Sequence, residues 1–233
     1  VLMTANFGSR TEEAFGKLEK LRPDEPNICM EFWNGWFDQW RTPHHTREPQ
    51  TIIDELKSII KADGHFNMYM FSGGTNFGFY NGSNCNPTFE PCITSYDYGA
   101  PVTECGDVTE QYYMLRKLLT GKTDKMPERI KRAYGKVTEF KGASLFDNLD
   151  IIGKTHISEN AMTIEDLGQN FGYILYEMDI EGMSGDIDIG EPHDRAMFFD
   201  GNTLIGEYER GIDYKTVSVS GVNKLKILVE NMG

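Results

Sequence analysis

Apolar runs and amphipathic helical patterns alternate along residues 1–121, and this alternation constrains the fold more than any other feature. The runs at 1–5, 28–33 and 66–71 predict β-strands, because they are short, apolar and bounded by turn residues. Helical spacing follows each of them. The resulting order is strand, helix, strand, helix, strand, loop, helix. It predicts three consecutive βα units of an α/β fold.

The expected helices carry recognisable start and stop signals. Ser9 with Glu12 three residues later reads as a capping box. Pro49 occupies a favoured first-turn position, and Gly64 and Gly121 end the second and third helices. The positions expected to face the core are Ala14, Phe15, Leu18 and Leu21 in the first helix, Ile52, Ile53, Leu56, Ile59 and Ile60 in the second, and Tyr112, Leu115, Leu118 and Leu119 in the third.

Beyond Gly121 the sequence changes character. Residues 122–136 are basic, contain a proline and predict a linker. From 137 to 233, short apolar runs are separated by Gly, Asn and Asp, which predicts an all-β sandwich or jelly roll that is incomplete at its C-terminus. The sequence Asp200-Gly201-Asn202 is a hairpin signal. The apolar runs are 151–152, 171–176, 196–199, 203–205 and 224–229.

Charge and composition narrow the range of partners. The formal net charge of −13 opposes binding to nucleic acids and to anionic membranes. No run of about 18 apolar residues exists that would span a bilayer. The chain begins and ends next to apolar runs and lacks an initiator methionine. We therefore expect a fragment of a longer protein, whose compartment the sequence leaves open, with a weak preference for the cytoplasm.

The segment from 29 to 40 has an unusual composition. It reads C-M-E-F-W-N-G-W-F-D-Q-W and holds all three tryptophans of the chain. Glu31 is expected near the C-terminal end of a strand, where α/β barrels carry their active sites, and Asn34-Gly35 supplies the turn that follows. A carboxylate among indoles suits a sugar site. The alternative is a strand-end glutamate on an aromatic core.

Three other groups of residues give weaker evidence for a disulfide or a metal site. Cys85 and Cys92 lie in one loop, and the sequence does not decide between a disulfide and free thiols. The histidines of the pair at 44–45 are expected to point in opposite directions, which disfavours a shared metal. Asp186 and Asp188 fit strand alternation better than a calcium loop.

Four longer segments resemble glycoside hydrolase family 35, the retaining β-galactosidases. They are I-C-M-E-F-W-N-G-W-F-D-Q-W at 28–40, N-M-Y-M-F-S-G-G-T-N-F-G at 67–78, T-S-Y-D-Y-G-A-P at 94–101 with E-C-G-D at 104–107, and G-Q-N-F-G-Y-I-L-Y at 168–176 with D-R-A at 194–196. The resemblance implies the C-terminal part of a (β/α)8 barrel at 1–121, followed by a β-sandwich domain at 137–233. Strands six to eight of the barrel would be present.

The resemblance also assigns residues to an active site. Glu31 matches the family's nucleophile, whereas the acid/base glutamate lies in an N-E-Y type motif that is absent from this chain. Gly99 stands where the family usually has Asp, which puts the hydrogen bonding of that loop in question. The residues matched to the galactose pocket are Trp36, Tyr69, Tyr96 and Tyr98, with Asn76 at the rim.

The reaction implied is hydrolysis of a terminal β-D-galactose by two displacements, without a metal or an organic cofactor. The substrate would be a galactoside or a galactose-terminated oligosaccharide. Three of eight strands cannot close a barrel, so the isolated chain is predicted to be inactive and poorly soluble.

Two further hypotheses stay open at this point. One is a retaining exo-glycosidase for another β-sugar. The other is a non-catalytic carbohydrate-binding protein, in which the sandwich half supplies the function. The sequence also leaves open the aglycone and linkage preference and whether the full-length protein forms a homo-oligomer.

Overall fold

The computed structural model describes residues 1–85, 87–211 and 216–233. The chain divides into two compact units. The first consists of residues 1–78 and 92–130, and the second of residues 79–91 and 131–233. In the part of the chain that the structure describes, no helix is long and apolar enough to cross a membrane.

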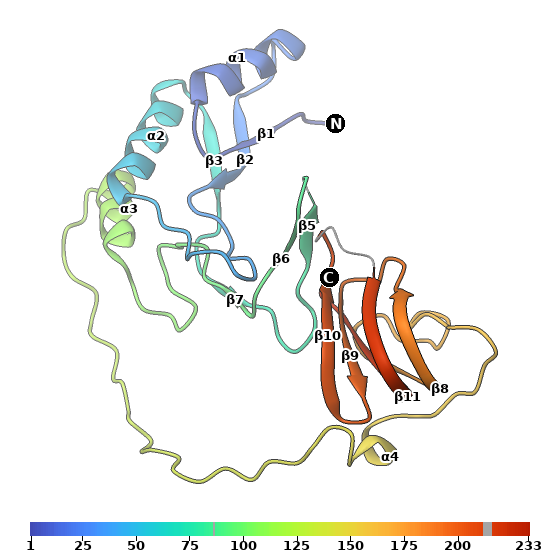
Figure 1. Cartoon of the computed structure of the whole chain (residues 1–233). Helices are drawn as coiled ribbons and strands as arrows, with labels where there is room; N and C mark the ends of the chain where they lie inside the picture. Colours follow the sequence, from blue (N-terminus) through green and yellow to red (C-terminus); the bar gives the residue numbers. More distant parts are fainter. Residues whose placement is uncertain (86, 212–215) are drawn as a thin grey trace. The chain divides into compact units, whose positions relative to one another are not determined.

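The first unit is built on a three-stranded parallel sheet in the order β1-β2-β3. Three helices pack on one face of this sheet, as the blue, cyan and light-green ribbons of Figure 1 show. The structure is thus mixed α/β in the predicted strand and helix order. The elements are β1 (Ala5–Phe7), α1 (Thr11–Leu21), β2 (Ile28–Trp33), α2 (Pro49–Lys61), β3 (His65–Tyr69) and α3 (Glu110–Thr120).

A hydrophobic core fills the space between the sheet and the helices. Phe32 in β2 and Leu56 in α2 are both fully buried, and Phe15 of α1 is 2% exposed. Each such side chain stabilises the fold by about 1.5–3 kcal/mol through removal of apolar surface from water. The expected core positions Leu21, Ile60 and Leu119 are wrong, because each lies at or near a helix end and is about half exposed or more.

The start of the first unit differs from the sequence prediction. The strand covers Ala5–Phe7 rather than residues 1–5, and Val1 is fully exposed. The capping box at Ser9 is also wrong, because Arg10 occupies the N-cap in a left-handed conformation without a side-chain cap. Glu55 of α2 replaces the cap by accepting hydrogen bonds from both the backbone N–H and the hydroxyl of Thr11, at 2.7 and 2.6 Å.

Two of the other predicted helix ends are confirmed, whereas the prediction that Gly64 ends α2 is wrong, because the helix ends at Lys61 and Asp63 takes the left-handed conformation (φ 51°). Pro49 lies in the first turn of α2. The Thr109 hydroxyl accepts a hydrogen bond from the Tyr112 N–H at the start of α3, at 3.3 Å. Gly121 ends α3 in the left-handed conformation (φ 71°) that glycine adopts without steric cost.

The long segment between β3 and α3 contributes to both units. In the first unit, β4 (Gly74–Thr75) pairs with β7 (Ser95–Tyr96). In the second unit, β5 (Ser83–Cys85) pairs with β6 (Phe89–Pro91). Within that unit the pair is held by a hydrogen bond from the Asn81 amide to the Met232 carbonyl, at 2.6 Å, and by the Arg210 guanidinium, which lies 5.0 Å from the centre of the Phe89 ring.

A four-stranded antiparallel sheet in the order β10-β9-β11-β8 forms most of the second unit (Figure 1). This sheet agrees with the predicted all-β half. The predicted apolar run at 151–152 is wrong as a strand, since it ends the short helix α4 (Leu149–Ile152) and is exposed. The strands are β8 (Gly172–Asp188), β9 (Arg195–Asp200), β10 (Thr203–Glu209) and β11 (Thr216–Asn231).

The predicted hairpin at Asp200 is confirmed. Asp200 pairs with Thr203 across a two-residue loop, in which Gly201 has a φ of 58°. Asp186 and Asp188 lie in β8, as alternation predicted. Among the described residues no group of His, Cys, Asp and Glu is arranged to hold a metal ion.

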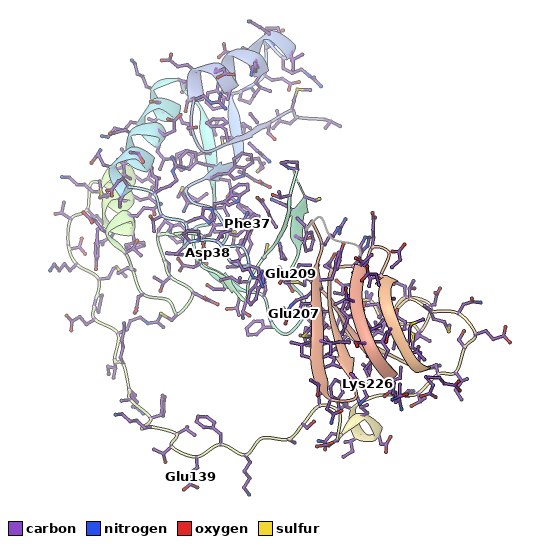
Figure 2. All side chains as sticks on the ribbon, in the orientation of Figure 1. Phe37, Asp38, Glu139, Glu207, Glu209 and Lys226 are labelled. Atoms are coloured by element: carbon purple, nitrogen blue, oxygen red, sulfur yellow. The ribbon has the colours of Figure 1, made fainter. Side chains whose placement is uncertain are left out.

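The two faces of the four-stranded sheet differ in character. One face is apolar and borders a cavity of about 680 Å³, whose lining includes Ile174, Phe198 and Ile227. On the other face lies Lys226, whose ammonium group is 4.2 Å from the centre of the Phe146 ring and 3.0 Å from the side-chain oxygen of Asn202. Figure 2 labels Lys226 on its strand.

Candidate active site

Glu31 lies two residues before the end of β2 and pairs with Asn6 of β1. Its backbone N–H donates to the side-chain oxygen of Asn6, at 3.1 Å. The pairing of β2 with β3 is irregular here, because the register shifts between Cys29 and Phe32, and both of those side chains are fully buried in the core. The irregularity leaves Glu31 partly exposed near the C-terminal edge of the parallel sheet.

The Glu31 carboxylate has a hydrogen-bond donor on its own strand. The indole N–H of Trp33 donates to Glu31 Oε2, at 3.0 Å. Two residues apart on a strand, these side chains share one face, which explains how they meet. The sequence placed Trp33 near Glu31 as one of the indoles of a sugar site, and it did not predict the hydrogen bond between them.

Three of the predicted pocket tyrosines are brought together. The hydroxyls of Tyr69 and Tyr96 are 3.2 Å apart and hydrogen-bonded. The Tyr98 ring stacks on Tyr96, with centroids 5.6 Å apart, and meets the Tyr69 ring edge-to-face, at 5.4 Å. Tyr69 ends β3 and Tyr96 ends β7, so the cluster joins separate elements.

The tryptophan-rich segment after β2 extends this cluster. Trp36 lies 6.3 Å from Tyr98 between ring centroids and meets Trp33 edge-to-face, at 5.9 Å. Phe37 stacks between Trp36 and Tyr96, at 4.9 and 5.7 Å. Figure 2 labels Phe37 and Asp38 in this segment. Phe37 was not among the predicted site residues, although its place in the aromatic run was a usable signal.

Tyr98 is held in an unusual backbone conformation. Its φ is 62° and its side chain is only 2% exposed. A bulky residue with positive φ is a true outlier, and such outliers concentrate at functional sites. Gly35 makes the arrangement possible, because a Cβ there would overlap the Tyr98 carbonyl oxygen. The Asn34 amide, fully buried, donates to the Gly99 carbonyl at 3.4 Å.

Burial dominates the electrostatics of the tyrosines. It raises the pKa of both Tyr96 and Tyr98 well above 10, and the negative charge of Glu31 raises the pKa of Tyr98 further. Both hydroxyls therefore keep their protons at neutral pH and are able to donate hydrogen bonds. Arg47 is half-buried and donates to the carbonyls of Trp33 and Gly8, at 2.5 and 3.0 Å. It thereby ties the ends of β1 and β2 together.

The histidine pair does not behave as the sequence predicted. Both rings approach the same carboxylate, with His44 Nδ1 2.6 Å from Asp38 Oδ2 and His45 Nδ1 3.2 Å from Asp38 Oδ1. The hydrogen bond that His44 donates to the Asp38 carboxylate raises the pKa of His44, and the charges of Asp38 and Asp97 raise it further. Burial raises the pKa of Asp38, but hydrogen bonds from His45 and His44 outweigh it and the net shift is downward.

Asn76 and the residues around it form hydrogen bonds within the protein. The Asn76 amide donates to the Ile93 carbonyl at 2.9 Å, and its backbone N–H donates to the Thr94 carbonyl at 2.7 Å. Gly99 has a φ of 61°, and its N–H donates to the Asp97 carboxylate at 3.3 Å. The loop that contains Gly99, where this chain departs from the family pattern, is therefore stabilised by a hydrogen bond to the Asp97 side chain.

The four cysteines are free thiols in the structure, so Cys85 and Cys92 are not bonded. Cys29, which precedes Glu31 by two residues in β2, is fully buried, and burial raises the pKa of its thiol to about 11. A thiol with that pKa is protonated and inert at neutral pH.

Two family profiles match parts of this chain. The profile described as "Glycosyl hydrolases family 35" matches residues 1–121, which is more than half of the chain. A second profile, described as "Beta-galactosidase, first all-beta domain", matches residues 161–233.

Curated proteins with related sequences carry similar names. Beta-galactosidase-1-like protein 2 of Homo sapiens is 38% identical over 93% of this chain and 36% of its own length. Beta-galactosidase-1-like protein 3 of Mus musculus is 36% identical over 100% of this chain and 37% of its own length. Beta-galactosidase of Xanthomonas manihotis is 34% identical over 100% of this chain and 41% of its own length.

The chain therefore spans roughly two-fifths or less of the length of these relatives. The similarity nevertheless runs through both of its units, and the profile match covers the whole segment that carries the Glu31 site. The chain belongs to the glycosyl hydrolases family 35.

Proposed function

We propose that this chain carries the nucleophile half of a retaining exo-β-galactosidase, with Glu31 as the nucleophile. The observation that carries the proposal is the position of Glu31, which is partly exposed near the C-terminal edge of a parallel sheet and hydrogen-bonded to an indole. In α/β barrels the reacting groups come from the C-terminal ends of the strands. The names of the curated relatives agree with a galactoside as the substrate.

The aromatic cluster supports an exo-acting sugar site. Trp36 and the tyrosines at 69, 96 and 98 combine apolar ring faces with hydroxyl donors, and such groups pack on a sugar ring and bind its hydroxyls. We assign these four residues to the terminal galactose pocket and Asn76 to its rim. Because Gly99 directly follows Tyr98 in the sequence, its loop would border the pocket.

The reaction proceeds by two displacements. Glu31 attacks the anomeric carbon while a second carboxyl group protonates the departing oxygen, and water then releases galactose from the ester. The second carboxyl group would come from a part of the protein upstream of this chain. We therefore predict that the purified 233-residue chain does not hydrolyse an aryl β-galactoside. Measurable turnover by this chain alone would contradict the proposal that another segment supplies the acid.

The decisive experiment uses the polypeptide extended upstream to a full barrel. It is treated with a 2-deoxy-2-fluoro-β-galactosyl fluoride, digested and mapped by peptide mass spectrometry. We expect the label on Glu31, and the Glu31→Gln variant should take up none. Trp40→Phe, which changes an exposed residue of the same segment, is the matched control and should be labelled like the parent.

Other outcomes would favour other functions. A label that appears only with a different fluoro-sugar would indicate a retaining glycosidase for another β-sugar. If the folded protein takes up no label but binds galactosides, a carbohydrate-binding protein derived from the hydrolase would explain the data.

A further inference from the structure

The hydrogen bond between Trp33 and Glu31 distinguishes the two oxygens of the carboxylate. The indole nitrogen lies 3.0 Å from Oε2, whereas no side chain in the described part of the protein donates a hydrogen bond to Oε1. Trp33 is itself held on two sides. Its carbonyl accepts from Arg47 at 2.5 Å, and its ring meets Trp36 edge-to-face.

We propose that Trp33 is a catalytic residue whose indole N–H holds Oε2 of Glu31, leaves Oε1 to attack, and speeds the second displacement. This inference rests on the proposed function, because it takes Glu31 as the nucleophile. Arg47 acts as a positioning residue, because its guanidinium fixes the backbone from which the indole extends.

The chemistry of the two steps assigns the indole its role. In the first step Oε1 forms a bond to the anomeric carbon, and the bond to the aglycone oxygen breaks as that oxygen takes a proton from the acid. The negative charge of Glu31 disappears, and Oε2 becomes the carbonyl oxygen of an ester. A hydrogen bond to an ionised acceptor is roughly twice as strong as one to a neutral acceptor. The Trp33 bond therefore weakens as the ester forms.

The second step reverses this change. Water attacks the anomeric carbon and gives its proton to the base, while the bond to Oε1 breaks and its electron pair returns to the carboxylate. The Trp33 bond strengthens as the charge develops on Glu31, so it stabilises the leaving group. Because the transition state is oxocarbenium-like, Glu31 keeps most of its negative charge in it. Removing the N–H should therefore slow the release of galactose from the enzyme and change the rate of ester formation little.

The test measures the two steps separately in the polypeptide extended upstream to the full barrel. For Trp33→Phe we expect the half-life of the 2-fluorogalactosyl-enzyme to lengthen by about fivefold to tenfold. With a dinitrophenyl β-galactoside, kcat and KM should fall together while kcat/KM stays within about twofold, because the covalent intermediate accumulates. Trp40→Phe, an exposed tryptophan nearby, should change neither quantity.

A second replacement guards against misfolding. The benzothiophene analogue of tryptophan at position 33 keeps the shape of the indole and lacks its N–H, so it should lengthen the half-life as Trp33→Phe does. An unchanged half-life with this analogue would overturn the inference, as would a fall in kcat/KM alone, which indicates a structural role. If the parent protein takes no label on Glu31, the proposed function itself fails. If the parent is labelled and the analogue leaves the half-life unchanged, only the inference about Trp33 fails.

Discussion

Replacing Gly35 with alanine would test whether the close approach of two backbone segments builds the aromatic site. A Cβ at position 35 would overlap the Tyr98 carbonyl oxygen and lie 2.7 Å from its carbonyl carbon. Carbon atoms in van der Waals contact are about 3.5–4.0 Å apart, so the Tyr98 backbone would have to withdraw by about 1 Å. Because backbone atoms cannot rotate away, we expect a loss of about 1–3 kcal/mol in the free energy of unfolding.

The matched control is Gly16→Ala in α1, where a Cβ meets no atom within 4 Å. The same substitution should there stabilise the protein by about 0.5–1 kcal/mol, because alanine loses less backbone entropy on folding. Urea unfolding with linear extrapolation measures both variants in the polypeptide extended upstream. Gly35→Ala should also lower kcat/KM by about 100-fold, the cost of a 1 Å misplacement at a reacting site. A Gly35→Ala protein as stable as its parent would refute the reasoning.

Three further predictions test other features. Thr109→Ala removes the N-cap of α3 and should lower the free energy of unfolding by about 1 kcal/mol. Ser9→Ala should change it by less than about 0.5 kcal/mol, because Ser9 does not cap α1. Urea unfolding of both variants measures the difference. Leu56→Ala should cost about 2–5 kcal/mol in the same assay, because it opens a cavity at a fully buried position. The hydrogen bond that His44 donates to Asp38 raises the pKa of His44, so the stabilising contribution of this bond is full below about pH 6.5 and is lost as the pH rises through the folded-state pKa. His44→Ala should therefore show a smaller fall in Tm between pH 6 and pH 8 than the parent, and an equal fall would contradict this.

The strand and helix order of the first unit was predictable because its signals are local. Pro49 and Gly121 mark helix ends through the conformations that their own backbones favour, and both were confirmed. Ser9 carried an equally clear signal that was wrong. Glu55 accepts hydrogen bonds from Thr11 at the start of α1 and so replaces the local cap. It lies 44 positions further along the chain than Thr11, and neighbouring residues do not reveal so distant a partner.

The candidate site was predictable in its members and not in its contacts. The resemblance pointed to Tyr69, Tyr96 and Tyr98, which the structure brings into one cluster. Phe37 was missed, because a phenylalanine within an aromatic run is as consistent with the core as with a site. The contacts of His44 and His45 with one carboxylate were missed for a different reason. The expectation of opposite directions assumed an extended strand, whereas those residues lie in a loop.

Two segments build the site, the one that follows β2 and the one that contains Tyr98, and each depends on the other for its conformation. The segment after β2 has no side chain at Gly35, and that space admits the carbonyl of Tyr98, whose left-handed backbone would be costly by itself. Two hydrogen bonds join the segments. The buried Asn34 amide donates to the Gly99 carbonyl, and the Ile93 N–H donates to the Asp38 carbonyl at 3.2 Å. Neither segment contains a long helix or strand that would fix it independently. The aromatic cluster should therefore form and unfold as one cooperative unit with the strand end that carries Glu31.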